Sequence, residues 1–161
     1  MVKVNFSDKG NQLVGFFYED SDGKQLGPEF QSKELGMLYL IVLFIEKRLS
    51  NDDDFDELSE KIINSKILEK MTEVNRAVNL SKQQLEKIKA HISIWIEKMK
   101  EELTRIMEMQ KKVAKFKKQF PKAPMIDMLP YNKKNIEANI EFFTKILATV
   151  EAFLNCENAN F

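Results

Sequence analysis

The longest regular pattern of apolar positions in this chain runs from Ser81 to Phe120 and is typical of a coiled-coil helix. Its apolar residues lie three and four apart, and Glu102 is the single interruption. The apolar residues are Leu85, Ile88, Ile92, Trp95, Met99, Ile106, Met109, Val113, Phe116 and Phe120. At 1.5 Å per residue, such a helix would be roughly 58 Å long. A helix of that length needs packing partners along its whole length, so the pattern raises the question of what covers each part.

The start of this helix carries two local signals. Ser81 and Gln84 have the spacing of a capping box, in which each side chain accepts a hydrogen bond from the other residue's backbone N–H. Leu80 and Leu85 occupy the two positions of a hydrophobic staple. Pro121 marks the end, because proline lacks the N–H that would continue the helix. We therefore expect one continuous helix from Ser81 to Phe120.

Three further helices are predicted, at about Ser32–Leu49, Asp54–Val78 and Tyr131–Asn155. The first is apolar on nearly every side between Leu35 and Ile45, which is typical of a central helix contacted by several neighbours. The last repeats the three-and-four spacing with Ile136, Ile140, Phe143, Leu147, Val150 and Leu154.

The N-terminal region has the composition of β-strands. Val2–Phe6 and Gln12–Tyr18 are rich in Val and Phe, and the residues between them favour a turn. The pattern predicts a β-hairpin, with room for a third short strand before Gly27 and Pro28 close the region.

The fold class that follows is mainly α: an antiparallel bundle of four helices, in which one long coiled-coil-like helix forms a projecting hairpin, with a small N-terminal β-hairpin. A chain of 161 residues fits a single domain. We expect residues 1–30 to be the β appendage and 31–161 the bundle, with residues 106–145 as the hairpin stem.

Helix lengths predict the register of the bundle, because short turns make consecutive helices antiparallel neighbours. Helix two folding back on helix three would place Phe55 beside about Arg105. Helix four returning from Tyr131 would cover helix three from Phe120 to about Trp95. Residues beyond Arg105 would then project as a two-helix stem.

That stem carries more large apolar residues than one helix–helix seam can bury, so we expect a partner-binding surface there. Flexible methionines suit such an adaptable surface. The partner is another protein or a second copy of the chain. The alternative is that helix one or two bends or extends to cover these residues as ordinary core. The predicted partner-binding residues are Met109, Val113, Phe116, Phe120, Met125, Ile126, Met128 and Leu129.

One strongly basic block lies within the same stem, and residues 111–122 contain no acid. It consists of Lys111, Lys112, Lys115, Lys117, Lys118 and Lys122. Interleaved with Phe116 and Phe120, the block suggests nucleic acid or another anionic surface as an alternative partner. Both aromatics also fall on the apolar seam, however, and the acidic block from Asp52 to Glu60 could compensate the lysines. We therefore rank a protein partner above an anionic one.

Composition limits the classes of partner and the cellular locations that we expect for this protein. Twenty-five basic and 25 acidic residues cancel, so no overall charge favours nucleic acid or membrane. The single cysteine, Cys156, fits a reducing compartment, and the first residues do not resemble a secretory signal. The longest apolar run, Leu35 to Ile45, is about half of what a bilayer crossing needs. We expect a cytoplasmic protein without a membrane span.

No catalytic, metal or cofactor motif is complete. His91 is the only histidine, and no carboxylate lies three or four residues from it, so the di-iron pattern is absent. Residues 18–29 have the spacing of a calcium loop, but Tyr18 replaces the first acidic ligand, which favours a hairpin turn. Cys156 has no activating neighbour in sequence. We expect no metal, no cofactor and no enzyme activity, since an enzyme would need a polar pocket that the sequence does not suggest.

Overall fold

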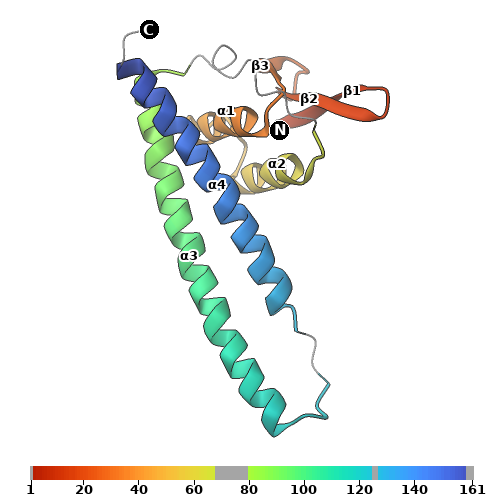
Figure 1. Cartoon of the computed structure of the whole chain (residues 1–161). Helices are drawn as coiled ribbons and strands as arrows, with labels where there is room; N and C mark the ends of the chain where they lie inside the picture. The colour runs from red at the N-terminus through yellow and green to blue at the C-terminus, as the bar shows by residue number, and fades with distance from the viewer. Residues whose placement is uncertain (1, 68–79, 125–126, 159–161) are drawn as a thin grey trace. The chain divides into compact units, whose positions relative to one another are not determined.

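The computed structural model describes residues 2–67, 80–124 and 127–158, without the side chains of 52, 53 and 156–158. The described chain is mostly helical, with four helices and a small antiparallel sheet at the N-terminus (Figure 1). It divides into two compact units, Met1–Ile88 with Thr149–Phe161, and Lys89–Ala148. The elements are β1 (Lys3–Lys9), β2 (Gln12–Glu19), β3 (Gln25–Phe30), α1 (Lys33–Ile45), α2 (Asp52–Asn64), α3 (Lys82–Gln119) and α4 (Leu129–Asn158).

The sheet of the first unit has the strand order β1-β2-β3, and both pairings are antiparallel. The predicted hairpin is present, and the third strand completes the sheet. β1 continues to Lys9 because a bulge between Ser7 and Asp8 restores its pairing with β2. β3 includes Pro28, which the sequence had suggested as a stop. Proline is tolerated there because β3 is an edge strand.

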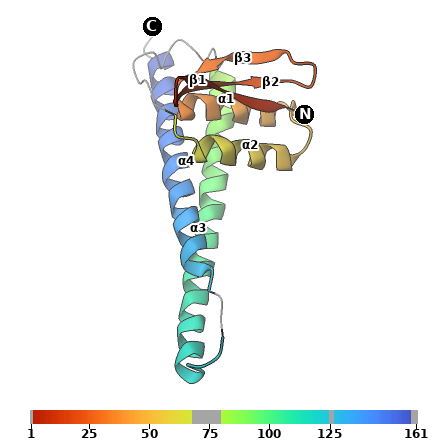
Figure 2. The same cartoon turned by 90° about the vertical axis from the view of Figure 1, so that its right-hand side faces the viewer.

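Helix α1 is the centre of the first unit, as its apolar pattern predicted. It contacts the sheet on one side and α2 on another (Figure 2). The α1 residues Met37, Leu38, Leu40, Ile41 and Leu43 have no exposed surface. A helix that is apolar all round is stable only when neighbours surround it, and here two different elements supply that cover.

Two glycines allow the sheet and α1 to come close together. A Cβ on Gly36 would lie 2.0 Å from Cζ of Phe16, so the Phe16 ring occupies the space above that helical residue. A Cβ on Gly27 would lie 2.5 Å from the Tyr39 ring, and Gly27 also has a φ of +74°. Each glycine therefore accepts an aromatic ring from the opposite element.

The end of α1 comes earlier than predicted, at Ile45 and not Leu49. Lys47 adopts a left-handed conformation with φ 58°. Its N–H donates to the Phe44 carbonyl at 3.1 Å, and the Arg48 N–H donates to the Leu43 carbonyl at 2.9 Å. These bonds form a Schellman motif, which satisfies the last carbonyls and ends the helix.

Helix α2 lies antiparallel to α1. Lys33 Nζ donates to the Ile63 carbonyl at 3.0 Å, near the start of α1 and the end of α2. At the other end, the rings of Phe44 and Phe55 have centroids 4.9 Å apart. This contact pattern agrees with the expectation that a short turn makes consecutive helices antiparallel neighbours.

The prediction that helix two extends to Val78 is wrong for its described part. α2 ends at Asn64, where Ser65 turns to extended backbone and its hydroxyl donates to the Ile62 carbonyl at 2.6 Å. Ile67 then pairs in parallel with Leu13 of β2. Residues 68–78 lie outside the described part of the chain. The placement of Phe55 beside Arg105 rested on the longer helix and stays a prediction.

The long helix is continuous, as predicted: α3 runs from Lys82 to Gln119 without a break. Its capping box is formed. The Ser81 N–H donates to Gln84 Oε1 at 3.0 Å, and the Gln84 N–H donates to Ser81 Oγ at 3.1 Å. Gln84 Nε2 also donates to Glu46 Oε1 at 2.8 Å, which ties the start of α3 to the end of α1 within the first unit.

Candidate functional site

The second unit, Lys89–Ala148, contains most of α3, the connecting segment and the first part of α4. Its first apolar positions are covered: Ile92 of α3 and Ile146 of α4 have no exposed surface, and Ile106 is 5% exposed. Burial ends there. All residues from 107 to 124 are described, and none of their side chains is buried. The unit therefore has a packed part and an unpacked part along the same helix.

The unpacked part holds the predicted partner-binding residues of α3. Met109 is 51% exposed, Phe116 40% and Phe120 54%, while Val113 is half-buried. The Phe116 and Phe120 rings contact each other, with centroids 5.0 Å apart. The sequence therefore identified a set of large apolar side chains that the described chain leaves open to solvent.

Only some of the predicted partner-binding residues that follow α3 are described. Met125 and Ile126 lie outside the described residues. Met128 is 54% exposed, and Leu129, the first residue of α4, is half-buried. We call the described residues of this set the stem surface: Met109, Val113, Phe116, Phe120, Met128 and Leu129.

The connecting segment is held to α3 near its end. Lys117 Nζ lies 3.6 Å from Asp127 Oδ2. The other oxygen of this carboxylate, Oδ1, accepts a hydrogen bond from the Leu129 N–H at 3.0 Å, beside the first turn of α4. Asp127 therefore links the last turn of α3 to the first turn of α4.

The contact between α3 and α4 has a different register from the predicted one. We expected α4 to return from Tyr131 beside Phe120, which would bring Trp95 near Asn155. Instead the rings of Trp95 and Phe143 meet, with centroids 6.1 Å apart in an edge-to-face arrangement. The difference arises because α4 begins further back along α3 than we had placed it, and not level with Phe120. Sequence reasoning missed this because the length of the connection, predicted as residues 121–130, does not say how far back along α3 it returns.

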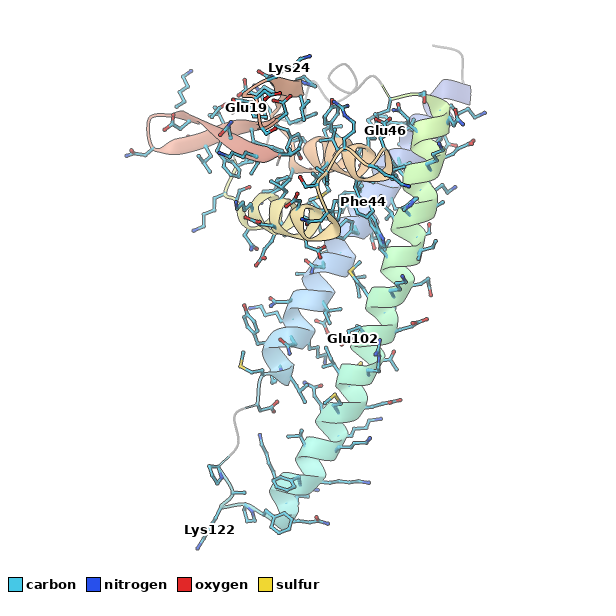
Figure 3. All side chains as sticks on the ribbon, turned by 180° about the vertical axis from the view of Figure 1, so that it is seen from behind. Glu19, Lys24, Phe44, Glu46, Glu102 and Lys122 are labelled. Carbon is cyan, nitrogen blue, oxygen red and sulfur yellow. The ribbon has the colours of Figure 1, made fainter. Side chains whose placement is uncertain are left out.

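All six lysines of the predicted basic block are exposed: Lys111, Lys112, Lys115, Lys117, Lys118 and Lys122. Figure 3 shows Lys122 just beyond the end of α3, and Glu102 several turns earlier on the same helix. Lys117 pairs with Asp127, and no described carboxylate lies within ion-pair distance of the other five lysines. The block is therefore a continuous source of positive charge around the stem surface.

The other candidates have structural roles. Tyr18 is fully buried and its hydroxyl donates to the Gly36 carbonyl at 2.6 Å, so it does not face the turn as a calcium ligand would. Asp20 Oδ1 accepts the N–H groups of Asp22 and Lys24, both at 2.9 Å, which shapes the β2–β3 turn. The His91 ring packs edge-on against Trp95.

The described residues contain neither a candidate metal site nor a candidate membrane-spanning helix. No three or more His, Cys, Asp or Glu side chains there come together in a way that could hold a metal ion. No helix of the described chain has the length and apolar character needed to cross a bilayer. The side chain of Cys156 lies outside the described set.

Comparison of the chain with protein-family models, with curated proteins and with solved structures gives no match.

Proposed function

We propose that this protein is a non-catalytic protein–protein interaction module, such as an adaptor, a chaperone-like factor or a regulator, which binds its partner through the stem surface. In this proposal α3 and α4 form an antiparallel helical hairpin within Lys89–Ala148. The Trp95–Phe143 contact and the Lys117–Asp127 ion pair support that hairpin, because each joins the α3 side to the α4 side.

The observation that carries the proposal is the end of burial after Ile106. The seam of α3 continues for another three turns with the same three-and-four spacing, yet no side chain from 107 to 124 is buried. Monomeric proteins rarely expose large contiguous apolar patches, and such patches usually mark interaction sites. A binding partner would cover these residues as α4 covers the earlier ones.

The sheet edges offer a weaker alternative interface. A free edge can pair with a strand of another chain. In this protein the register of β1 against β2 shifts between Ser7 and Asp8, where Val14 of β2 has no partner. β1 has a lysine at each end, and β3 contains Pro28. Bulges, edge lysines and prolines all discourage strand addition. These features favour the stem surface over the sheet.

The proposal is tested by replacing Met109, Phe116 and Phe120 with Gln in the full chain. The matched control is Ile94→Gln, because Ile94 is also on α3 and is 55% exposed but lies outside the stem surface. Self-association is measured by sedimentation velocity, and partner capture by quantitative crosslinking in native lysate. We expect the triple variant to stay folded and to lose the association or capture that the control retains. Equal association and capture by both variants would contradict the proposal.

A second candidate function is binding to nucleic acid or another anionic surface through the basic block. The observation that favours it is the exposure of all six lysines over residues 111–122, which contain no acid. Backbone contacts of this kind weaken steeply with added salt. If this function is correct, replacing several of the lysines with Glu should abolish binding to a nucleic-acid duplex. The variant with Gln at Met109, Phe116 and Phe120 should bind the duplex normally.

A further inference from the structure

The end of α3 extends beyond the beginning of α4. The Trp95–Phe143 contact sets the register in the second unit. Leu129, the first residue of α4, lies fourteen residues before Phe143, and Met109 lies fourteen residues after Trp95, so antiparallel helices bring these two residues to the same level. α3 continues for ten more residues, to Gln119. At 1.5 Å per residue, about 15 Å of helix has no α4 beside it. Figures 1 and 2 show α3 continuing past the beginning of α4.

The apolar seam continues along this extension. Met109, Val113, Phe116 and Phe120 are spaced four, three and four apart, which is the spacing of the seam that α4 covers further back. At 100° per residue, they fall within about 60° of the helix circumference. The chain thus presents one straight apolar stripe, and the position that α4 occupies at Trp95 is free of helix at Phe116.

Charge borders this stripe on both sides. At 100° per residue, Lys112 and Lys117 lie about 70° to either side of the centre of the stripe, and Lys118 lies nearly opposite it. Lys117 pairs with Asp127, so the charge that a partner would meet beside the stripe is mainly that of Lys112. No acid occurs from residue 109 to residue 126. An apolar stripe flanked by one sign of charge is complementary to an amphipathic helix whose flanking residues have the opposite sign.

Charge also argues against a second copy as the occupant. Two copies of this face would bring the exposed lysines of one against those of the other, and like charges at such positions are destabilising. Phosphates of a nucleic acid would satisfy the lysines but would leave Met109 and Val113 without a role, because aliphatic side chains do not stack on bases as aromatic rings do. An acidic amphipathic helix satisfies both the stripe and the lysines.

We infer that the last three turns of α3, residues 109–119 with Phe120, bind an acidic amphipathic helix of another protein. The inference rests on the proposed function and names the chemistry of the partner. The bound helix takes the place beside α3 that α4 takes nearer Trp95. Its apolar residues meet Phe116 and Phe120, and its acidic residues meet Lys112 and its neighbours.

The test uses the full chain and three labelled peptides of about 18 residues, or five helical turns. The first has Leu at heptad seam positions and Glu beside them, the second has the same composition in scrambled order, and the third has Lys in place of Glu. Binding is measured by fluorescence anisotropy at low and physiological salt. We expect the first peptide to bind at least about tenfold more tightly than the other two, with affinity that falls as salt rises.

Paired variants locate the binding to one face. Phe116→Gln with Phe120→Gln should weaken the first peptide about tenfold or more, as loss of central aromatic contacts usually does. Ile94→Gln should change little. Lys112→Glu should weaken binding severalfold more than Lys118→Glu, which makes the same charge change on the opposite side of the helix. Circular dichroism checks that every variant is folded.

Three results would overturn the inference. One is equal binding of the amphipathic and scrambled acidic peptides, and another is equal loss from Lys112→Glu and Lys118→Glu. The third is tighter binding of a nucleic-acid duplex, or of phosphatidylserine-containing vesicles, than of the acidic peptide. If the crosslinking experiment still shows capture that depends on Met109, Phe116 and Phe120, the proposed function stands and only the chemistry of the partner is wrong. If that dependence is also absent, both fail.

Discussion

The core around α1 and the last turns of α3 use the same kinds of residue with opposite results. Phe16 and Phe30 in the sheet are 0% and 1% exposed, whereas Phe116 and Phe120 are 40% and 54% exposed. Both pairs contact each other through their rings, at 5.8 and 5.0 Å. The difference lies in the neighbours, because the sheet rings face α1 as well as each other.

This contrast shows which neighbours make an aromatic side chain part of the core. In the first unit, two glycines let rings approach the opposite backbone, and the Tyr18 hydroxyl finds an acceptor in the Gly36 carbonyl. At the end of α3, no described residue supplies such a second layer. We therefore expect changes in the first region to affect folding and changes in the second to affect binding.

The largest expected difference comes from truncating one phenylalanine in each region. Phe16→Ala should reduce the free energy of unfolding by about 3–5 kcal/mol, because it leaves a cavity in a filled core. Phe116→Ala should reduce it by less than about 1 kcal/mol, since its ring is already partly in water. Urea denaturation of the full chain measures both. Similar losses would mean that Phe116 is core and that the stem surface is not free for a partner.

The close approach of α1 to the sheet gives a prediction with a definite sign. In an ordinary exposed helix, Gly→Ala stabilises by roughly 0.5–1 kcal/mol. Gly36→Ala should instead destabilise by about 1–3 kcal/mol, because the new methyl group would overlap the Phe16 ring. Combining it with Phe16→Leu should recover part of the loss. Stabilisation by Gly36→Ala alone would show that the two elements lie further apart.

The start of α3 depends on a local contact, the capping box of Ser81 and Gln84. Ser81→Ala should lower the free energy of unfolding on the order of 1 kcal/mol, since the Gln84 N–H loses its acceptor, Ser81 Oγ. Ser93→Ala is the control, because Ser93 lies in the helix interior and its hydroxyl only bonds back to the Lys89 carbonyl. Thermal melting followed by circular dichroism compares the two. An unchanged midpoint in Ser81→Ala would argue against the cap.

A further effect concerns Tyr18, in the core around α1, and depends on pH. Burial raises the pKa of the Tyr18 phenol well above 10, and the nearby Tyr39 adds to the shift. The folded state therefore holds this proton more tightly than the unfolded state. The resulting stability is complete below about pH 10, the pKa of an unperturbed tyrosine, and is lost as the pH rises through the folded-state pKa.

Tyr18→Phe should therefore lower stability by about 1 kcal/mol at neutral pH, through loss of the hydrogen bond to Gly36. It should also make unfolding less steep with pH above about 10, because one group no longer titrates. Tyr131→Phe is the control, since Tyr131 is 60% exposed and lies at the start of α4. Identical alkaline profiles for the wild type and Tyr18→Phe would contradict the assignment.

Local signals in the sequence determined the features that depend on near neighbours. The capping box at Ser81 and Gln84, the continuity of α3, the hairpin between β1 and β2, and the burial of α1 all follow from spacing and residue type. For the candidate site, the sequence identified which side chains of α3 belong to the apolar seam. These features are predictable because their causes lie within a few residues along the chain.

The tertiary structure decided where each seam is covered. The end of α2 at Asn64 depends on Ile67 pairing with the distant Leu13, and the end of α1 depends on Lys47 taking a left-handed conformation that residue type alone disfavours. The register of Trp95 against Phe143 depends on where α4 begins beside α3, which the apolar pattern of either helix leaves open. Contacts between distant segments set the end of α2 and the register of α3 against α4, so the exposure of Phe116 could be read only from the folded chain.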